Sequence, residues 1–371
     1  MEITVSKFEL LRELAATQGV VERKTTIPIL SNYLFEAGGD RLSLTATDLD
    51  LSLRTSCNAK VKKEGSCAIP ARKLHDYVKL LPDADITIKL LETQWISIRC
   101  GRSNTKMVGM SRSNFPSLPA FPTAGAVRIP AQVLRGMIAR TGFAIANEES
   151  RYTLNGALMV LKPESITMVA TDGHRLAHVE RSNETFEGVS GEMKTLIPKK
   201  AMDELRALAD STEADTVEFA KDESTLYFRV GPRLLTSRQL TGQFPNYEAV
   251  LPKDNNRIIA LHGDELAASI SRVAQFADER SRAVRLKLEA GELKLSASSS
   301  ETGESEDSLE TDYNGEPLTI GFNVQYITDF LKAVGSGDVR LELKDSQSAG
   351  QLRPAGNEDY NYRYIVMPMR I

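Results

Sequence analysis

Residues 165–180 read SITMVATDGHRLAHVE, and the same pattern occurs at residues 41–54 as RLSLTATDLDLSLR. In both stretches apolar residues alternate with polar ones up to Ala-Thr-Asp, the chain turns, and the alternation resumes. A period of two on each side of a turn predicts a β-hairpin with one buried face. A third copy, GELKLSASSSETGESEDSLE at 291–310, keeps the alternation but has a longer, acidic turn.

The flanks of these hairpins repeat as well. A short strand and an amphipathic helix precede each hairpin, and a second strand, a second helix and three further strands follow it. The predicted helices cover residues 6–20, 70–81, 130–146, 198–209, 262–277 and 323–334. The sequence therefore predicts an α+β fold of three repeated domains, each built from two strand–helix–three-strand units with antiparallel sheets. Clusters of Pro, Gly and Asn between the copies place the domains at 1–122, 123–253 and 254–371.

Composition narrows the class of protein. An apolar fraction of 41% and a charged fraction of 26% are those of an ordinary globular protein. The sequence contains neither a signal-peptide pattern nor a long apolar run, so we expect a cytoplasmic protein. Three cysteines without C-x-x-C spacing indicate reduced thiols, and the four histidines form no ligand pattern with them. We therefore expect neither a metal nor a cofactor.

Charge is distributed unevenly. The chain carries a net charge of −4, whereas the six predicted helices hold twelve Lys or Arg and eight Asp or Glu. Basic helices on an acidic protein could present one positive face to a polyanion. Ordinary amphipathic helices with solvated basic faces explain the same count.

The ATDGHRLA turn has a catalytic interpretation, with Asp172 and His174 or His178 as acid and base. Against it, the matching turn of the first repeat, TDLDL, has no histidine, and neither a glycine-rich phosphate loop nor a nucleophile elbow accompanies it. A scaffold that binds only proteins is a second alternative. Repeat arrays leave sheet edges at their ends, and edges that meet head to tail close a ring of one, two or more chains.

Several motifs together resemble the bacterial sliding clamps, the beta subunits of DNA polymerase III. They are the threefold repeat, ATDGHRLA with RYTLNG (151–156) before it, GFNVQYITDFL (321–331) and the terminal YIVMPMRI (364–371). The resemblance implies sheets outside, helices lining a ring, and two chains that meet head to tail around duplex DNA. It implies a processivity factor that makes and breaks no bond. The implied partners are the polymerase III catalytic subunit, the clamp loader and other proteins that carry short clamp-binding motifs.

The resemblance also implies a cleft for short partner peptides. Its residues would be Leu154, Thr171, Gly173, His174, Arg175, Leu176, Pro245, Val250, Asn323, Tyr326, Ile365, Val366, Met367, Pro368, Met369 and Arg370. Methionines give a deformable apolar floor that suits different side chains. Two alternatives stay open: His174 as a structural turn residue, and Met367 or Met369 as plugs of the third domain's core.

Nucleic-acid contacts and a chain–chain interface follow from the same resemblance. Lys24, Arg151 and Tyr152 would face DNA and contact it independently of base sequence, although Lys24 and Tyr152 also suit an ordinary exposed loop. The interface would pair one domain edge with another, and its residues would be Arg102, Lys106 and Met107 against Gln275, Phe276, Glu301, Glu304 and Glu306.

Four positions depart from the family pattern. Ser281 and Gln347 stand where apolar groove residues are usual, and Ala249 stands where an arginine is common. Thr153 replaces an aromatic residue beside Tyr152. The first three leave open which motif residues the cleft prefers, and the fourth predicts weaker DNA contact at its loop.

Overall fold

The computed structural model describes residues 1–22, 25–122, 125–148, 150–182, 186–356 and 359–370. These residues form two compact units. The first comprises Met1–Arg135 with Lys200–Gln239, and the second comprises Gly136–Lys199 with Leu240–Ile371. The units therefore do not coincide with the three sequence repeats, because the middle repeat contributes to both.

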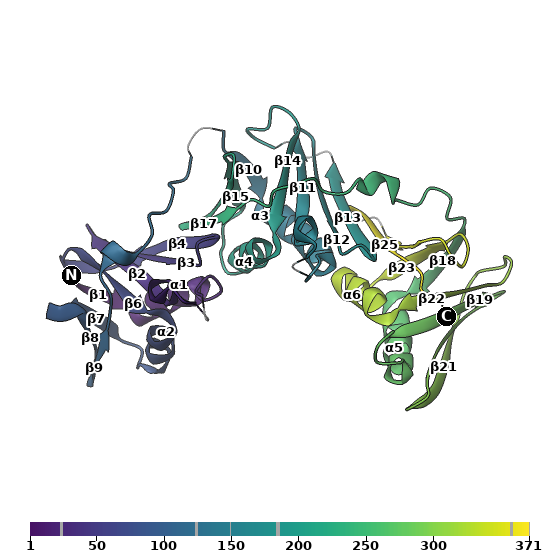
Figure 1. The fold of residues 1–371 in the computed structure, drawn as a ribbon, viewed down its shortest axis with the longest axis horizontal. Helices are drawn as coiled ribbons and strands as arrows, with labels where there is room; N and C mark the ends of the chain where they lie inside the picture. Colours follow the sequence, from purple (N-terminus) through teal and green to yellow (C-terminus); the bar gives the residue numbers. More distant parts are fainter. Residues whose placement is uncertain (23–24, 123–124, 149, 183–185, 357–358, 371) are drawn as a thin grey trace. The chain divides into compact units, whose positions relative to one another are not determined.

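The predicted order of strand, helix and three strands occurs six times (Figure 1). The first repeat contains β1 (Glu2–Ser6), α1 (Lys7–Thr17), β2 (Asn32–Gly38), β3 (Arg41–Thr47), β4 (Leu51–Asn58), the additional β5 (Lys60–Lys63), β6 (Gly65–Pro70), α2 (Ala71–Leu80), β7 (Asp85–Leu90), β8 (Trp95–Cys100) and β9 (Ser103–Val108). The second contains β10 (Val127–Pro130), α3 (Ala131–Thr141), β11 (Gly156–Lys162), β12 (Ser165–Thr171), β13 (Arg175–Ser182), β14 (Met193–Pro198), α4 (Lys199–Asp210), β15 (Thr216–Lys221), β16 (Thr225–Val230) and β17 (Arg233–Arg238). The third contains β18 (Arg257–His262), α5 (Gly263–Val273), β19 (Ala283–Glu289), β20 (Glu292–Ser299), β21 (Gly303–Glu310), β22 (Leu318–Asn323), α6 (Val324–Val334), β23 (Asp338–Leu343), β24 (Gly350–Pro354) and β25 (Asn361–Val366).

The three hairpins predicted from the repeated pattern are confirmed as β3–β4, β12–β13 and β20–β21. Their alternation has the expected physical cause: Leu42, Leu44 and Ala46 are fully buried, as are Ile166, Met168 and Ala170. The six predicted helices are also present. The first, third and fifth are several residues shorter than predicted: α1 stops at Thr17, and the 3-10 turns Gly142–Ala144 and Ala274–Phe276 follow α3 and α5.

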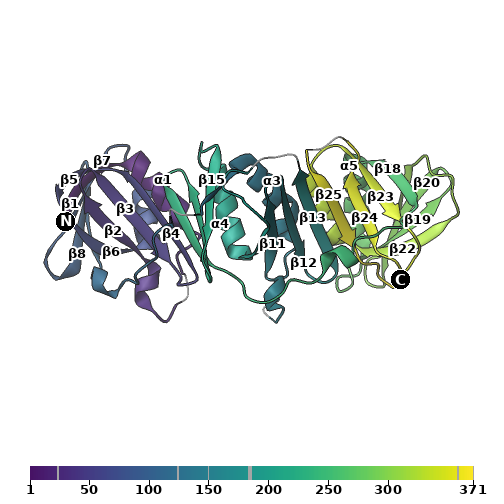
Figure 2. The same cartoon turned by 90° about the horizontal axis from the view of Figure 1, so that it is seen from above.

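Strand pairing crosses the repeats, which the sequence pattern did not predict. The first unit has a five-stranded sheet, β5-β1-β7-β8-β9, and an eight-stranded sheet, β10-β15-β16-β17-β4-β3-β2-β6. The second unit has an eight-stranded sheet, β14-β11-β12-β13-β25-β24-β23-β18, and a four-stranded sheet, β21-β20-β19-β22. In both large sheets, strands of two successive repeats are joined by one antiparallel pair, β4 with β17 and β13 with β25 (Figure 2).

The segment after β17 packs on the large sheet of the second unit. Leu240 is buried in an apolar cluster with Leu176 and Ile365, and Phe244, Tyr247 and Leu251 lie against that cluster. Side-chain hydrogen bonds also hold this segment: Arg363 of β25 donates to the Pro252 carbonyl at 2.8 Å, and Asn255 of the segment donates to the carbonyls of Glu342 and Ala349. The linker is thus fixed to the sheet by apolar packing and hydrogen bonds.

All three cysteines are free and buried. Burial raises the pKa of Cys57 and of Cys67 to about 12, so both thiols are protonated at neutral pH. Among the described residues, none of the helices combines the length and apolar character needed to span a bilayer.

Candidate functional site

The ATDGHRLA motif forms a tight turn between β12 and β13. The Thr171 hydroxyl donates to the Arg175 carbonyl at 2.6 Å and accepts from the Gly173 amide at 3.1 Å. One carboxylate oxygen of Asp172 accepts the amides of His174 and Arg175 at 2.9 and 3.1 Å. Gly173 has φ of 89°, a conformation that favours glycine. The Thr171 hydroxyl and one carboxylate oxygen of Asp172 therefore hold the turn in place.

The first repeat contains the same turn without the histidine. The Thr47 hydroxyl donates to the Leu51 carbonyl and accepts from the Leu49 amide, both at 3.0 Å. Asp48 accepts the amides of Asp50 and Leu51 at 3.0 and 2.6 Å. Because an equivalent Thr-Asp pair folds a turn that has no histidine, the pair is explained by backbone geometry, without any proton transfer.

Arg175 lies at the centre of a charged cluster under the turn. Its guanidinium contacts the carboxylates of Asp172 at 3.0 Å and Asp329 at 2.6 Å, and it donates to the Phe143 carbonyl at 2.6 Å. The rings of Phe143 and Tyr326 lie 5.5 and 4.5 Å from its carbon Cζ. The side chain is only 10% exposed.

The charges in this cluster reinforce one another. Burial alone would lower the pKa of Arg175, but interactions with the Tyr364 hydroxyl and Asp329 raise it above its usual range. Burial also raises the pKa of the Tyr364 hydroxyl. Arg175 thus stays charged, and its side chain connects β13 to α6 and to the 3-10 turn after α3. Asp329, Phe143 and Tyr364 were missed from the sequence, because nothing in their local pattern marks a partner some 30 to 190 positions away.

The C-terminal segment lies against the turn and extends the second unit's sheets. Arg175 and Leu176 pair with Val366 and Ile365 in the β13–β25 ladder. Beyond β25, the Met367 amide donates to the His174 carbonyl at 2.9 Å, and the Met369 amide donates to the Gly321 carbonyl at 2.8 Å.

The structure separates the floor of this region from its rim. Ile365, Val366 and Leu176 are buried, whereas Met367 is 45% exposed beside the exposed His174. Pro368 and Met369 are half-buried and Arg370 is exposed. Met367 is therefore available at the surface, and the plug interpretation does not apply to it.

The remaining predicted cleft residues lie on three other segments of the second unit. Asn323 caps α6 by accepting the Gln325 amide at 2.9 Å, and Tyr326 follows one turn into that helix. Burial raises the pKa of Tyr326, and Asp172 adds to the shift. Leu154 is half-buried in a 3-10 turn, Tyr152–Leu154, while Pro245 and Val250 are exposed on the linker over the sheet.

Arg151 contacts the turn directly. Its Nη1 donates to the Asp172 carbonyl, and its Nε lies 3.4 Å from a carboxylate oxygen of Glu148. A Cβ added at Gly173 would lie 2.6 Å from that Nη1. Tyr152, beside it, is 53% exposed. Of the three predicted DNA-facing residues, Lys24 lies outside the described residues.

The predicted interface residues lie on or beside β9 and β21, each an edge strand of its sheet. Arg102 precedes β9, which contains Lys106 and Met107 and ends the five-stranded sheet. Glu304 and Glu306 lie on β21, which ends the four-stranded sheet, and Glu301 precedes it. Gln275 and Phe276 form the 3-10 turn after α5, which contacts β21.

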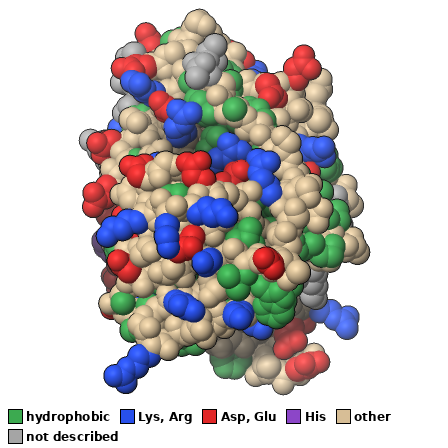
Figure 3. All heavy atoms as spheres, turned by 90° about the vertical axis from the view of Figure 1, so that its left-hand side faces the viewer, with side chains coloured by type: hydrophobic (Ala, Val, Ile, Leu, Met, Phe, Trp, Pro, Cys, Tyr) green, Lys and Arg blue, Asp and Glu red, His purple; other side chains and the backbone are tan. Residues whose placement is uncertain are grey.

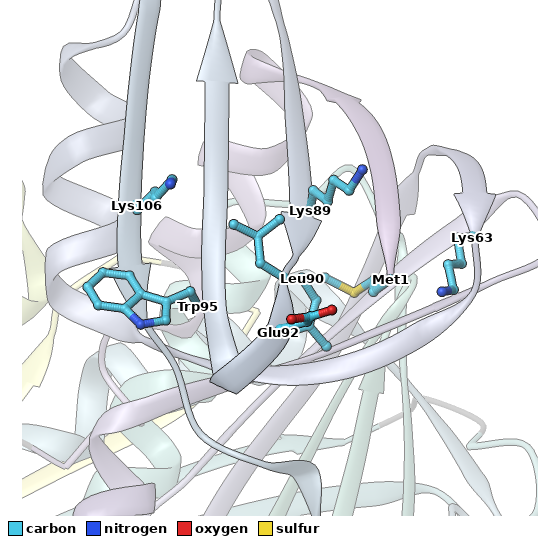
Figure 4. A pocket seen from close by; sticks show the side chains of 8 residues that line it. Met1, Lys63, Lys89, Leu90, Glu92, Trp95 and Lys106 are labelled. Atoms are coloured by element: carbon cyan, nitrogen blue, oxygen red, sulfur yellow. The ribbon is translucent and has the colours of Figure 1, made fainter.

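The face beside β9 is basic. Lys60, Lys62, Lys89, Arg99 and Lys106 are exposed on the five-stranded sheet. Figure 3 views the side that carries β1 and β7 to β9, and Lys and Arg side chains gather over the middle of that face. A hollow of 870 Å³ opens there, with Trp95 and Lys106 on one side and Lys89, Met1 and Lys63 on the other (Figure 4).

Comparison with known families covers nearly the whole chain. Residues 1–119 match the N-terminal domain of the DNA polymerase III beta subunit, residues 128–246 match its central domain, and residues 248–370 match its C-terminal domain. The beta sliding clamp of Pseudomonas putida is 37% identical over all of both chains. The chain belongs to the beta sliding clamp family.

Solved structures agree with that assignment. The sliding clamp of Pseudomonas aeruginosa, solved bound to griselimycin, superposes with a TM-score of 0.93 at 36% identity over all of both chains. The Caulobacter crescentus clamp, solved with polyethylene glycol bound to a putative beta-motif tethering region, superposes with a TM-score of 0.92 at 34% identity, again over all of both chains. The chain is accordingly a sliding clamp that supports processive DNA replication, with DNA and a replicative polymerase as partners.

Proposed function

We propose that this clamp acts without catalysis, as a head-to-tail homodimer whose six domains close a ring around duplex DNA. The domain boundaries proposed from the sequence, 1–122, 123–253 and 254–371, are close to the ends of the family matches. Cytoplasmic location, the clamp loader and other motif-bearing proteins as partners belong to the same proposal.

The strand pairing supports the head-to-tail arrangement. Each repeat contains two strand–helix–three-strand units. In both eight-stranded sheets, the last strand of the first unit in one repeat pairs with the last strand of the second unit in the next repeat. These pairs are β4 with β17 and β13 with β25. Two such last strands remain at sheet edges, β9 and β21. We apply the same rule between the third repeat of one chain and the first repeat of a second chain. It pairs β21 with β9 of the partner subunit. This pairing continues both sheets and removes both edges.

The rule also fixes the register. In the β4–β17 pair, Leu53 lies opposite Leu235. Ser305 is the residue of β21 equivalent to Leu53, because Leu53 pairs with Ala46 in the first hairpin and Ser305 pairs with Ala297 in the third. Thr105 is the residue of β9 equivalent to Leu235, because each lies two residues after the first residue of its strand, which follows a hairpin turn. Ser305 would therefore pair with Thr105 of the partner subunit, which places Glu304 opposite Lys106 of the partner subunit. Directly opposed opposite charges stabilise an antiparallel pair by about 0.2–1 kcal/mol.

The cleft residues support a second role, capture of short partner peptides. The exposed Met367 and His174 lie on backbone held by hydrogen bonds, and an apolar cluster with Leu176 and Ile365 lies beneath them. Apolar walls with a few fixed polar groups suit peptide recognition. Arg151 and Tyr152 would contact DNA phosphates at the neighbouring loop.

Retention on DNA tests the ring. The clamp, loaded by its clamp loader, should stay on nicked circular plasmid through gel filtration and leave the same plasmid after linearisation, because a ring slides off free ends. Native mass spectrometry should give twice the 40.9 kDa chain mass. Equal retention on circular and linear DNA, or a single-chain mass at micromolar concentration, would contradict the proposal.

A further inference from the structure

A second hollow, of 780 Å³, lies on the four-stranded sheet of the second unit beside the peptide cleft. Its residues come from β19 and the loop before it, from β20 and β21, and from the C-terminal segment: Ser281, Ala283, Arg285, Ser296, Ala297, Ser298, Glu304, Ser305, Glu306 and Arg370. The cross-strand rows explain the hollow. Arg285, Ser296 and Glu306 form one row, and Ser298 pairs with Glu304 two residues further along, so small side chains lie beside the charged ones.

This hollow lies on the sheet face opposite α5. Leu286 and Leu295 point to the buried side, where Asp307 of β21 makes an ion pair with Arg272 of α5. Arg285 and Ser296, one position away in each strand, point to the other side. Met369 pairs with Gly321 of β22, so the chain end brings Arg370 to the hollow's rim. Figure 2 shows the chain end beside β22 and β19.

The charges of this hollow are not neutralised by one another. Within the described residues, neither Arg285 nor Arg370 has a carboxylate within ion-pair distance, although two glutamates line the same hollow. Those glutamates, Glu304 and Glu306, lie on the edge strand that the proposed ring pairs with β9 of the partner subunit. The two arginines remain on the side toward the cleft, where Met367 and Met369 lead into Arg370.

We propose that this hollow is an anion-selecting extension of the cleft, which binds an aspartate or glutamate flanking the apolar anchors of a partner peptide. The inference rests on the proposed peptide role of the cleft. The carboxylate of a peptide residue next to the cleft would lie nearest Arg370 and Arg285, and both arginines can donate several hydrogen bonds to it. The serines between them supply further donors, whereas a basic flank would meet two like charges.

Labelled peptides with one glutamine and two spaced leucine or phenylalanine anchors test the proposal. Each peptide is extended by Asp-Asp, Ser-Ser or Lys-Lys at one end, and a second set carries the same extensions at the other end. In fluorescence anisotropy with the intact clamp, Asp-Asp should bind about two- to fivefold tighter than Ser-Ser at one end only, and Lys-Lys weaker, as expected for exposed ion pairs. Raising the salt concentration should reduce the difference.

Variants assign the effect to the hollow. Arg285→Ser should abolish the preference for Asp-Asp over Ser-Ser, and Arg285→Glu should invert the preference toward Lys-Lys. Lys287→Ser is the matched control, because Lys287 is the next outward residue of β19 and does not line the hollow. Flanks without effect at either end, or a preference that survives Arg285→Ser, would overturn the inference while leaving the cleft intact. Failure of every peptide to bind would instead overturn the cleft assignment and the inference with it.

Discussion

Leu49 and Gly173 occupy the same position in two copies of one turn, and both have positive φ, 83° and 89°. Only glycine adopts this conformation without strain, so the first repeat keeps a strained leucine where the second has glycine. Leu49 is 54% exposed, so little packing offsets the strain.

We expect Gly173→Ala to destabilise the clamp by about 1–2 kcal/mol, because alanine adds strain and its Cβ would meet Arg151. Leu49→Gly should stabilise it by about 0.5 kcal/mol, since relief of strain exceeds the entropic cost of glycine. Urea unfolding at fixed protein concentration measures both. Equal effects of the same sign at the two positions would mean that the turn conformations differ in solution.

Removal of residues 367–371 should abolish peptide binding and leave the dimer intact, because the exposed Met367 lies beyond the last sheet strand. Asp172→Asn should reduce affinity by no more than about threefold, since an amide oxygen can still accept the two turn amides that bind Asp172. Asp48→Asn, in the equivalent turn, is the control. Peptide titration decides the matter, and complete loss in Asp172→Asn alone would give the carboxylate a direct role.

Arg175→Met should cost about 3 kcal/mol or more of unfolding free energy, because it leaves Asp172 and Asp329 facing each other across a half-buried site. The expected signature is loss of the second unit's cooperative transition in denaturant melts. Arg151→Met, which removes a more exposed guanidinium from the same turn, should cost less than 1 kcal/mol. Similar losses in both variants would contradict a central role for Arg175.

His178 should make the clamp sensitive to acid. Burial, with Arg363 nearby, lowers the pKa of His178 to about 4, and its ring lies tilted against that of Tyr247, with the ring centroids 5.6 Å apart. The unfolded histidine titrates near 6.5, so between about pH 6.5 and 4 only the unfolded chain binds this proton. Stability from this site is therefore complete above about pH 6.5 and falls as the pH drops toward 4. His178→Phe keeps an aromatic ring against Tyr247 and should show a smaller fall in melting temperature between pH 7.5 and 5.0.

The proposed register predicts a charge swap at the ring seam. Lys106→Glu should weaken the dimer, because it opposes Glu304 of the partner subunit with a like charge, and Glu304→Lys should do the same. The double variant should regain most of the loss. Lys89→Glu, two strands from the β9 edge, is the control. Sedimentation at nanomolar concentration measures each dimer, and additive losses in the double variant would place the pair elsewhere.

The hairpins and helices could be predicted from the sequence, whereas most of the strand pairing between distant segments could not. Alternation in 41–54 and 165–180 reports a buried face, so the hairpins and helices followed from periodicity. Alternation does not say which strand lies next to β4 or β13, because every strand with one apolar face satisfies it equally. The turn at Thr171 was visible in the letters, but its tie through Arg175 to Asp329 depends on tertiary folding.

Trp95 is the only tryptophan of the chain, and it stands on β8, paired with Val108 of the open edge strand. At 42% exposure its indole is partly in water, in the hollow that also contains Lys106. The tryptophan emission of this clamp therefore comes from one position in each chain, one strand from the seam. Closure of the ring should shift that emission to the blue, and opening should reverse the shift, so the unlabelled protein carries its own optical signal of loading.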